Sequence, residues 1–463
     1  FAPDVTPLGE DFATGLLVTE GELVLKGDGT SASTVQAKGQ FTVGMNVTNM
    51  NVAAQPKLTL DGVWLDGTGG NGASSHSAVG WGLGRSQASG QRTPAFELRN
   101  GARYRCNTLR MGLGTSNRRM GDHSRLTMTD SALIAGAVYF ESEIAQNPSV
   151  VRCTNALVAT LSYPIYTAGA VDLVFSSSRV GAGAGSLQSP SLVNEINPDP
   201  DAWDAGKYNF GPLGWNLHLP TGRVEFADGS LLRARLRHFN RLQKPFEIVW
   251  DDSEWDYGKE ADYAFDETVA NDLFTMTVRG KGLKLRPSAG TTFTVVHPIV
   301  GDGGVCNVGA GAVKFAADAL AFSGTCRAAP GATIDLSEAG PLSGVKFGGA
   351  GTVSGGTFRG RVSVMSEMAE DGHVADAPTF TGCDFTGATL LVDCGRTAES
   401  PLADPLPTNV RVARLVNCTG VPALRLKSRS TGRTFVSGAF AVDPATGDVY
   451  LDVISAGLML IVR

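Results

Sequence analysis

The sequence reads Ala312-Val313-Lys314-Phe315, Ala332-Thr333-Ile334-Asp335-Leu336, Gly344-Val345-Lys346-Phe347 and Arg361-Val362-Ser363-Val364 within one Gly-rich stretch, from Gly301 to Met365. Apolar and polar residues alternate in each string, which is typical of a β-strand with one buried face. Gly, Ala, Ser or Pro-Gly interrupts every string after a few residues. Strands this short do not suit a β-sandwich, but they suit a coil that turns every few residues, and stacked coils of this kind form a β-solenoid.

The same phrase recurs outside this stretch. Lys57-Leu58-Thr59-Leu60-Asp61-Gly62-Val63-Trp64-Leu65 is echoed at 125–133 and more loosely at 151–157 and 414–421. Each copy has two apolar residues, a corner of small polar residues, and another apolar residue. Asp, Asn and Gly at the corner tolerate the left-handed backbone conformation of a sharp turn. Residues 16–29 follow a related order of strand, Gly turn, strand and Gly-Asp-Gly turn. The pattern predicts coils along much of the chain.

These phrases resemble the coils of right-handed parallel β-helices, especially autotransporter passenger domains and related secreted β-strand-repeat proteins. The resemblance is clearest at 16–29, 57–65, 98–140 and 305–364, about half of the chain. It implies an all-β parallel β-helix and an extracellular or cell-surface location in a bacterium. It implies no particular activity, because one fold hosts many functions.

Composition agrees with an all-β body rich in turns. Charged residues make up 18% of the chain, and Gly accounts for 58 of 463 residues, against the roughly 25% and about 7% that are usual. The net charge of -6 argues against nucleic acid as a partner, because nucleic-acid binding needs a concentrated basic face. The apolar runs are shorter than the ~18 residues of a membrane span, so we expect none.

The chain divides into five predicted parts. Residues 1–15 are expected to form an extended arm, 16–190 and 271–405 two stretches of β-solenoid, and 406–463 a C-terminal β cap. Residues 191–270 break the pattern and are interpreted as a lateral insertion or a thickened coil. The cap is expected to be a hairpin of 449–453 with 458–462, because an open solenoid end exposes unpaired strand edges.

The predicted insertion holds the main candidate site. Four of the six Trp lie there (Trp203, Trp215, Trp250 and Trp255), beside acids that include Asp251, Asp252 and Glu254. Flat aromatic rings near carboxylates suit sugar binding, and paired carboxylates can hydrolyse glycosides, so these three acids are the catalytic candidates if the protein is an enzyme. The alternative is structural: the acids pair with Arg233, Arg235 and Arg237 or face water, and the Trp pack in the interior.

Other residues carry weaker signals for a site. Asp199, Asp201 and Asp204 resemble a calcium loop but lack its Gly and distal Glu, and no His or Cys spacing fits a metal, so no metal or cofactor is predicted. The separation of Cys306 from Cys326 is close to one coil, which favours a disulfide if the protein is secreted; the alternative is two buried thiols. Cys394 and Cys418 have a similar separation.

The first functional hypothesis is a secreted structural or adhesive β-solenoid without catalytic activity that assembles into a homo-oligomer, such as a filament or a surface layer. Its ends would exchange strands through Phe1 and Pro3 in the arm and Leu458, Leu460 and Val462 in the tail. The alternatives are a carbohydrate-active β-helix, either a polysaccharide lyase or a glycoside hydrolase, and a passive glycan-binding module that uses the Trp. Glycans or a cell surface are the expected partners.

Overall fold

A computed structural model describes residues 16–18, 21–30, 34–36, 41–45, 55–67, 76–81, 93–112, 124–142, 148–160, 165–181, 216–218, 222–237, 245–257, 262–265, 273–365, 367–368, 374–393, 409–426 and 434–458. These residues form strands and turns and contain no helix, so the described part of the chain has no helix that could span a membrane. They divide into two units. Unit 1 comprises 1–258 and 267–275, and unit 2 comprises 259–266 and 276–463.

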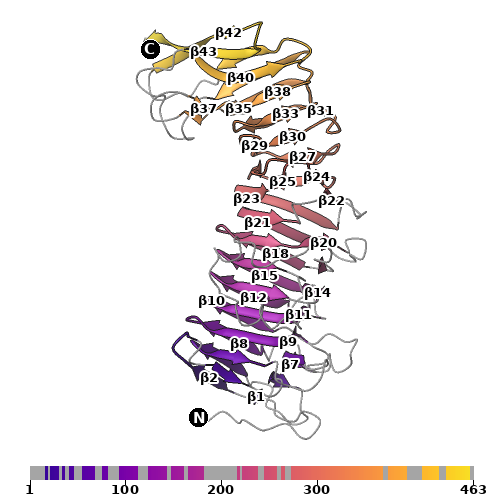
Figure 1. The fold of residues 1–463 in the computed structure, drawn as a ribbon, viewed down its shortest axis with the longest axis vertical. Helices are drawn as coiled ribbons and strands as arrows, with labels where there is room; N and C mark the ends of the chain where they lie inside the picture. The colour runs from indigo at the N-terminus through magenta and orange to yellow at the C-terminus, as the bar shows by residue number, and fades with distance from the viewer. Residues whose placement is uncertain are drawn as a thin grey trace, which may run out of the picture. The chain divides into compact units, whose positions relative to one another are not determined.

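Unit 1 is a parallel β-solenoid with three sheets. The first sheet contains β2 (Glu22–Lys26), β5 (Lys57–Asp61), β8 (Ala95–Arg99), β10 (Arg125–Thr129), β12 (Ser149–Thr154), β15 (Val171–Ser176), β18 (Gly222–Ala227) and the start of β21 (Phe246–Asp256). Each strand pairs in parallel with the strand one coil later, and Figure 1 shows these strands lying one above the other.

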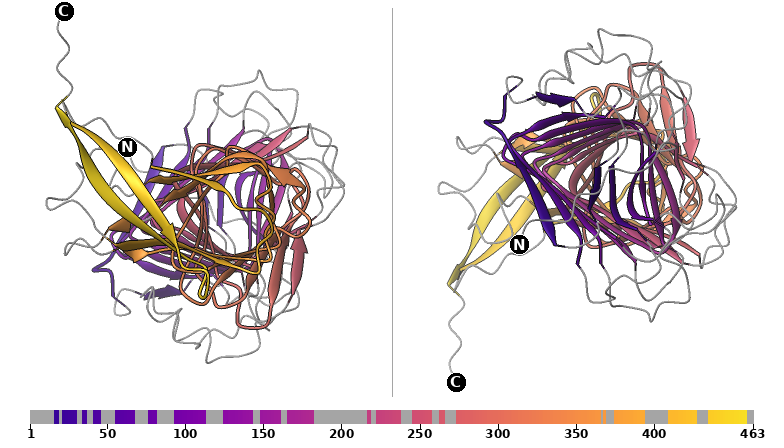
Figure 2. Two further views of the ribbon diagram at one scale, coloured as in Figure 1. Left: turned by 90° about the horizontal axis from the view of Figure 1, so that it is seen from above. Right: turned by 90° about the horizontal axis from the view of Figure 1, so that it is seen from below.

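The second and third sheets of unit 1 are built in the same way. The second sheet contains β3 (Thr34–Gln36), β6 (Trp64–Asp66), β13 (Leu157–Thr160), β16 (Arg179–Gly181), β19 (Leu231–Arg233), the end of β21, and the first halves of β9 (Arg103–Met111) and β11 (Ala132–Ser142). The third sheet contains β1 (Leu16–Val18), β4 (Phe41–Met45), β7 (His76–Trp81), β14 (Ile165–Gly169), β17 (Asn216–His218), β20 (Arg235–Arg237) and the second halves of β9 and β11. Seen end-on, these strands enclose the interior (Figure 2).

The corner between the first and second sheets explains the recurring small polar residues. Successive coils place a residue with positive φ at this corner: Asn100, Asp130, Asn155, Ser177, Asp228 and Asp252. Buried serines follow several of them, and the Ser253 hydroxyl donates to the carbonyl of Phe226 at 2.9 Å. The polar side chains therefore satisfy backbone groups that each sharp turn leaves inside, as buried polar groups require.

Unit 2 is also a parallel β-solenoid. One of its sheets contains the end of β23 (Phe274–Leu285), β26 (Val305–Asn307), β29 (Thr325–Ala328), β32 (Lys346–Gly348), β35 (Gly360–Met365), β39 (Ala388–Asp393) and β41 (Ala423–Leu426). A second contains β22 (Tyr263–Phe265), β24 (Thr292–Val295), β27 (Ala312–Phe315), β30 (Thr333–Asp335), β33 (Thr352–Ser354), β38 (Thr379–Thr381) and β40 (Val410–Val416). Val305 pairs with Cys326 and Val313 with Ile334, so a coil here is 21 residues long.

Glycine makes this tight coil possible. A Cβ on Gly282, where φ is +75°, would lie 1.8 Å from the carbonyl oxygen of Gly304, and a Cβ on Gly324 would lie 1.9 Å from that of Gly303. Backbones of successive coils therefore approach more closely at these positions than any side chain permits. This contact accounts for the Gly-rich composition of the stretch that predicts the fold.

Two boundaries differ from the sequence predictions. The strands β18, β19, β20 and β21 pair in parallel with β15, β16, β17 and β18, so residues 222–237 and 245–256 belong to regular coils and not to a lateral insertion. Residues 191–215, 219–221, 238–244, 258–261 and 266–270 of the predicted insertion lie outside the described residues. The predicted hairpin of 449–453 with 458–462 is also different: β43 (Asp448–Leu458) is one strand, paired antiparallel with β42 (Thr434–Val442) and with β40. Ile454 and Ser455, which the predicted hairpin places in its turn, instead pair with Ser437 and Val436 of β42.

Candidate functional site

Two of the four tryptophans of the predicted glycan site lie in the interior of unit 1. Trp250 and Trp255 on β21 are fully buried and stack with ring centroids 5.7 Å apart, and Trp250 stacks in turn on Phe226 at 4.8 Å. Both rings therefore fill the interior of unit 1, and the prediction that they bind glycans is wrong for these two. Trp203 and Trp215 lie outside the described residues, as do Asp199, Asp201 and Asp204.

The predicted acids occupy a corner of the coil. Asp252 has a φ of 49° and sits in the column of corner residues described above, and the backbone carbonyls of Asp251 and Asp252 accept hydrogen bonds from the amides of Asp228 and Gly229 at 3.1 and 2.7 Å. Asp251, Asp252 and Glu254 are half-buried. Their backbone has a structural role in the turn, and this placement does not itself indicate a catalytic carboxylate pair.

Arg233 pairs with a different acid, Asp256, and not with one of the three candidate acids. Arg233 Nε lies 2.9 Å from Asp256 Oδ2 in a pair whose side chains are only 15% and 8% exposed. Arg235 Nε donates to the carbonyl of Tyr257 at 3.1 Å. Arg233 of β19 and Arg235 of β20 therefore connect one coil to the end of β21 in the next coil.

The predicted disulfide between Cys306 and Cys326 is absent from the structure, where both are free thiols. Cys306 pairs with Arg327, while Cys326 pairs with Val305, because the two cysteines are separated by one residue less than a full coil. A shift of one residue turns a side chain to the opposite face of a strand. Cys326 is buried in the interior, and Cys306 is half-buried on the other face.

The predicted assembly residues are mostly outside the described part of the chain. Phe1, Pro3, Leu460 and Val462 fall there. Leu458 ends β43, where it pairs with Thr434 of β42.

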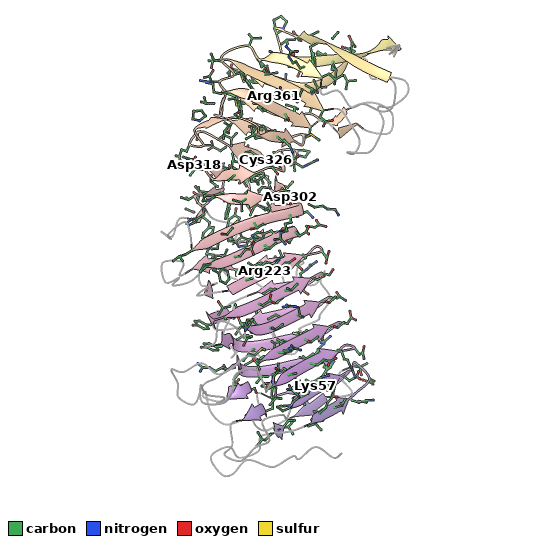
Figure 3. The ribbon with its side chains drawn as sticks, turned by 180° about the vertical axis from the view of Figure 1, so that it is seen from behind. Lys57, Arg223, Asp302, Asp318, Cys326 and Arg361 are labelled. Atoms are coloured by element: carbon green, nitrogen blue, oxygen red, sulfur yellow. The ribbon has the colours of Figure 1, made fainter. Side chains whose placement is uncertain are left out.

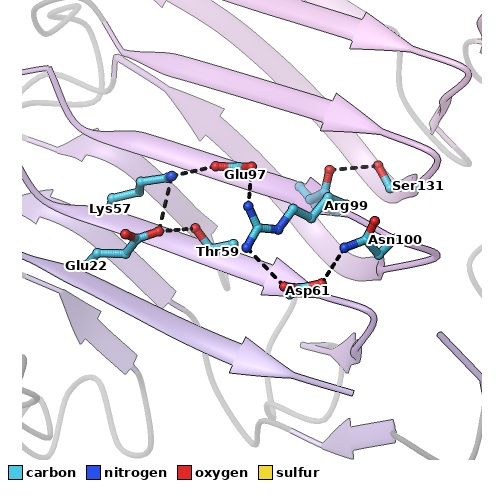
Figure 4. A network of polar contacts seen from close by, with 9 residues as sticks. Glu22, Lys57, Thr59, Asp61, Glu97, Arg99, Asn100 and Ser131 are labelled. Carbon is cyan, nitrogen blue, oxygen red and sulfur yellow. Dashed lines mark hydrogen bonds and ion pairs between the residues drawn. The ribbon is translucent and has the colours of Figure 1, made fainter. Parts of the chain in front are cut away.

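The first sheet of unit 1 carries balanced charge on its outer face. Lys57 Nζ lies 3.1 Å from Glu22 Oε1 and 2.5 Å from Glu97 Oε2, and Arg99 contacts both Glu97 and Asp61. Figure 4 shows this network, and Figure 3 shows Lys57 and Arg223 on the same sheet. Arg223 and Arg152 likewise pair with Glu225 and Asp172.

These contacts favour the charged forms. Hydrogen bonds from Thr59 and Lys57 lower the pKa of Glu22, and those from Asn100 and Arg99 lower the pKa of Asp61. Burial opposes the charge on Lys57, but hydrogen bonds to Glu97 and Glu22 outweigh it and raise the pKa of Lys57. The network leaves this face with little net charge.

The third sheet of unit 1 presents a different outer face. Arg110, Tyr139 and Tyr166 are register partners on three successive coils, and we call these three residues the ladder. Their neighbours along the strands, Leu109, Met111, Val138, Phe140 and Ile165, are buried, so the half-buried ladder side chains face outward.

The geometry of the ladder is specific. The Arg110 guanidinium carbon lies 4.3 Å from the centroid of the Tyr139 ring, and the Tyr139 and Tyr166 rings stack at 4.5 Å with their planes 6° apart. Each contact is favourable in its own right, a cation–π interaction and an aromatic pair. Because Arg110 and Tyr166 come from the coils on either side, they cover opposite faces of the Tyr139 ring.

The ladder continues in backbone register and has basic neighbours. His218 pairs with Tyr166, and Arg237 pairs with His218. On the adjoining second sheet, the Arg103 guanidinium carbon lies 3.9 Å from the Trp64 ring centroid, and Arg105 and Arg179 are half-buried. On this side of unit 1, arginines therefore lie against aromatic rings, whereas Arg99, Arg152 and Arg223 of the first sheet contact acids.

Sequence reasoning missed the ladder. Tyr139 and Tyr166 each stand between inward apolar residues, which is a visible signal for an outward position. Their alignment is not visible, because the coils of unit 1 vary in length: Val151 pairs with Leu173, while Leu173 pairs with Val224 across a much longer segment.

Among the described residues, no three His, Cys, Asp or Glu side chains are grouped so that they could hold a metal ion. In comparisons with known proteins, no protein-family model matches this chain, and no curated protein sequence matches it significantly. The structure therefore identifies the chain by its fold, as an all-β protein built from parallel β-solenoid coils.

Proposed function

We propose that this chain is an adhesive β-solenoid of the extracellular or cell-surface type, which binds an acidic polysaccharide along the ladder and its arginine neighbours without catalysis. The observation that carries the proposal is the column in which Arg110 covers Tyr139 and Tyr139 stacks on Tyr166. The resemblance of the coil phrases to autotransporter passenger domains supports the location.

The chemistry of the ladder suits such a ligand. Its rings cover one another, so the column offers ring edges, phenolic hydroxyls and a guanidinium. Guanidinium groups bind carboxylate and sulfate groups through paired, charge-assisted hydrogen bonds. The ladder residues repeat at the spacing of parallel strands, about 4.8 Å, so an extended polymer with regularly repeated acidic groups can meet equivalent positions on successive coils.

A binding assay tests the proposal. We expect heparin and polygalacturonate, but not neutral dextran, to bind the full chain in biolayer interferometry, with an affinity that falls as salt rises. Tyr139→Ala and Arg110→Ala should weaken binding about tenfold or more. Arg152→Ala is the matched control, because Arg152 lies on the first sheet and pairs with Asp172. Equal losses in Arg110→Ala and Arg152→Ala, or no binding to either polyanion, would reject the proposal.

Self-assembly through the chain ends is part of the same proposal. The β43 strand covers β40 on one side and is itself covered by β42. We propose that the 1–15 arm and the 458–462 tail join neighbouring molecules by strand addition. Deleting Phe1 to Gly15 should abolish filaments or layers seen by electron microscopy, and unchanged assembly would contradict this part.

A further inference from the structure

Two cysteines of unit 2 are aligned on successive coils. Phe380 pairs with Leu415 and Thr381 with Val416, and an isolated parallel bridge joins Asp384 to Thr419. Both strands end before the cysteines, but the offset of 35 residues is the same at the strand ends and at the bridge, so Cys383 is the partner of Cys418. The amide of Thr419 donates to the carbonyl of Cys383 at 2.9 Å, which fixes this register.

The alignment meets the geometric requirement of a disulfide. Register partners on neighbouring parallel strands point to the same face and have Cα atoms about 4.8 Å apart, inside the ~4.4–6.8 Å range of disulfides. Gly382 and Asn417, which precede the two cysteines, both have positive φ (62° and 52°), so the two backbones follow the same path up to Cys383 and Cys418. Cys306 and Cys326, by contrast, lie on opposite faces.

The two thiols differ in access. Cys383 is 1% exposed, and its sulfur lies 3.6 Å from the carbonyl oxygens of Val353 and Thr381. Cys418 is half-buried, with its sulfur 3.4 Å from the carbonyl oxygen of Phe380. An oxidant in solution therefore reaches Cys418 first.

We propose that Cys383 and Cys418 form a reversible disulfide that joins two successive coils of unit 2. The Cys418 thiolate attacks one sulfur of a small disulfide such as oxidised glutathione, whose S–S bond breaks and releases one thiolate. Cys383 then loses its proton to solvent and attacks the Cys418 sulfur of the mixed disulfide, releasing the second thiolate. Two protein thiols are oxidised, and one small disulfide is reduced to two thiols.

The electrostatics of the pair agree with this order. The hydrogen bond from Cys383 lowers the pKa of Cys418 to about 7, and the same contact raises the pKa of Cys383. Burial raises the pKa of Cys153, Cys326 and Cys306. Since the thiolate is the attacking species, Cys418 is the reactive one of these thiols near neutral pH.

Peptide mapping after oxidation tests the proposal. The folded full chain is incubated with oxidised glutathione, alkylated and digested. We expect one linked peptide pair that contains Cys383 and Cys418, the loss of two of the seven thiols, and a melting temperature of unit 2 that rises by about 5 °C or more until dithiothreitol reverses it. A Cys394→Ser variant should behave like the parent.

Two variants separate the pair from its neighbours. Cys383→Ser and Cys418→Ser should each abolish the linked peptide and the rise in melting temperature. A linkage of Cys394 to Cys418, or seven free thiols after oxidation of the folded parent chain, would overturn the proposal. If a variant does not fold, alkylation of the parent chain by iodoacetamide still decides. Cys418 should react fastest, with a midpoint near pH 7, and faster reaction at another cysteine would contradict the assigned order.

Discussion

The indole Nε1 of Trp255 donates a 2.7 Å hydrogen bond to the carbonyl oxygen of Ala234, in the interior of unit 1. Trp250 lies in the same stack and is equally buried, but its Nε1 has no hydrogen-bond partner among the described residues. The two tryptophans are therefore matched in size and burial and differ in one polar contact.

The hydrogen bond of Trp255 predicts that the two tryptophans respond differently to the same substitution. Trp255→Phe and Trp250→Phe both remove the same volume, but only Trp255→Phe leaves a buried carbonyl without its donor. Trp255→Phe should therefore lower the free energy of unfolding by about 1 kcal/mol more than Trp250→Phe. Urea unfolding followed by circular dichroism measures both. Equal destabilisation would show that the hydrogen bond contributes nothing net.

A second pair of variants probes the close coil contact in unit 2. Gly282 and Gly290 have φ values of 75° and 77°, but a Cβ at Gly290 would meet nothing within 4 Å. Gly290→Ala should cost about 1–2 kcal/mol for the left-handed conformation alone. Gly282→Ala adds a clash with Gly304 and should prevent unit 2 from folding or lower its melting temperature much further. Similar melting temperatures in the two variants would contradict the contact.

A third prediction compares two ion pairs of unit 1. Arg233 and Asp256 are largely buried, whereas the Arg152 and Asp172 side chains are 43% and 32% exposed. Arg233→Ala leaves a buried carboxylate without this partner and should cost about 2–3 kcal/mol. Arg152→Ala removes an exposed pair and should cost about 1 kcal/mol or less. Chemical denaturation of the two variants gives the comparison, and the reverse order would be inconsistent with the burial.

The fourth prediction concerns acid stability. The Asp384 carboxylate accepts hydrogen bonds from the hydroxyl and amide of Thr386 at 2.6 and 2.9 Å and from Arg359 at 2.8 Å. These contacts, the Thr386 hydroxyl first, hold the pKa of Asp384 well below its usual range. A lowered pKa stabilises the fold fully above the unfolded value, about 4, and this stabilisation is lost as pH falls below it.

Asp384→Asn should therefore lower the melting temperature of unit 2 at pH 7 by a few degrees and reduce its further fall between pH 5 and pH 2. Scanning calorimetry across this range provides the measurement. Asp302→Asn is the control, because Asp302 is an exposed aspartate of the same unit. An unchanged pH dependence in Asp384→Asn would contradict the role given to its carboxylate.

The fold could be predicted from sequence because its cause is local. In strings such as Ala312–Phe315, the alternation of apolar and polar residues predicts which side chains point inward, and the structure places Val313 and Phe315 in the interior. The corners can also be predicted from sequence, because Asp and Asn tolerate positive φ, as Asp130 and Asn155 show. Both signals lie within a few residues of sequence.

The site could not be predicted in the same way, because it depends on register between coils. The separation between Cys306 and Cys326 is one residue shorter than a full coil, and this difference places the two thiols on opposite faces of the sheet. Tyr139 and Tyr166 meet only because the whole coil between them, which includes β12 and β13, has the length that brings them into register. Trp250 and Trp255 were predicted as ligand-binding residues because composition reports an aromatic cluster without reporting which side of the strand it occupies.

Two successive coils of unit 2 are equal in length, and this has an evolutionary consequence. Val305 meets Cys326, and Cys326 meets Phe347, at equal intervals of 21 residues, and each inward residue contacts its counterpart one coil away. If one complete coil were duplicated, the new coil would therefore pack against both neighbouring coils through the same inward residues. If a single residue were added inside a strand, every side chain after it would point to the opposite face until the next turn. Lineages of such proteins can therefore change length in discrete steps of one whole coil, by gene duplication, without inventing a new interior.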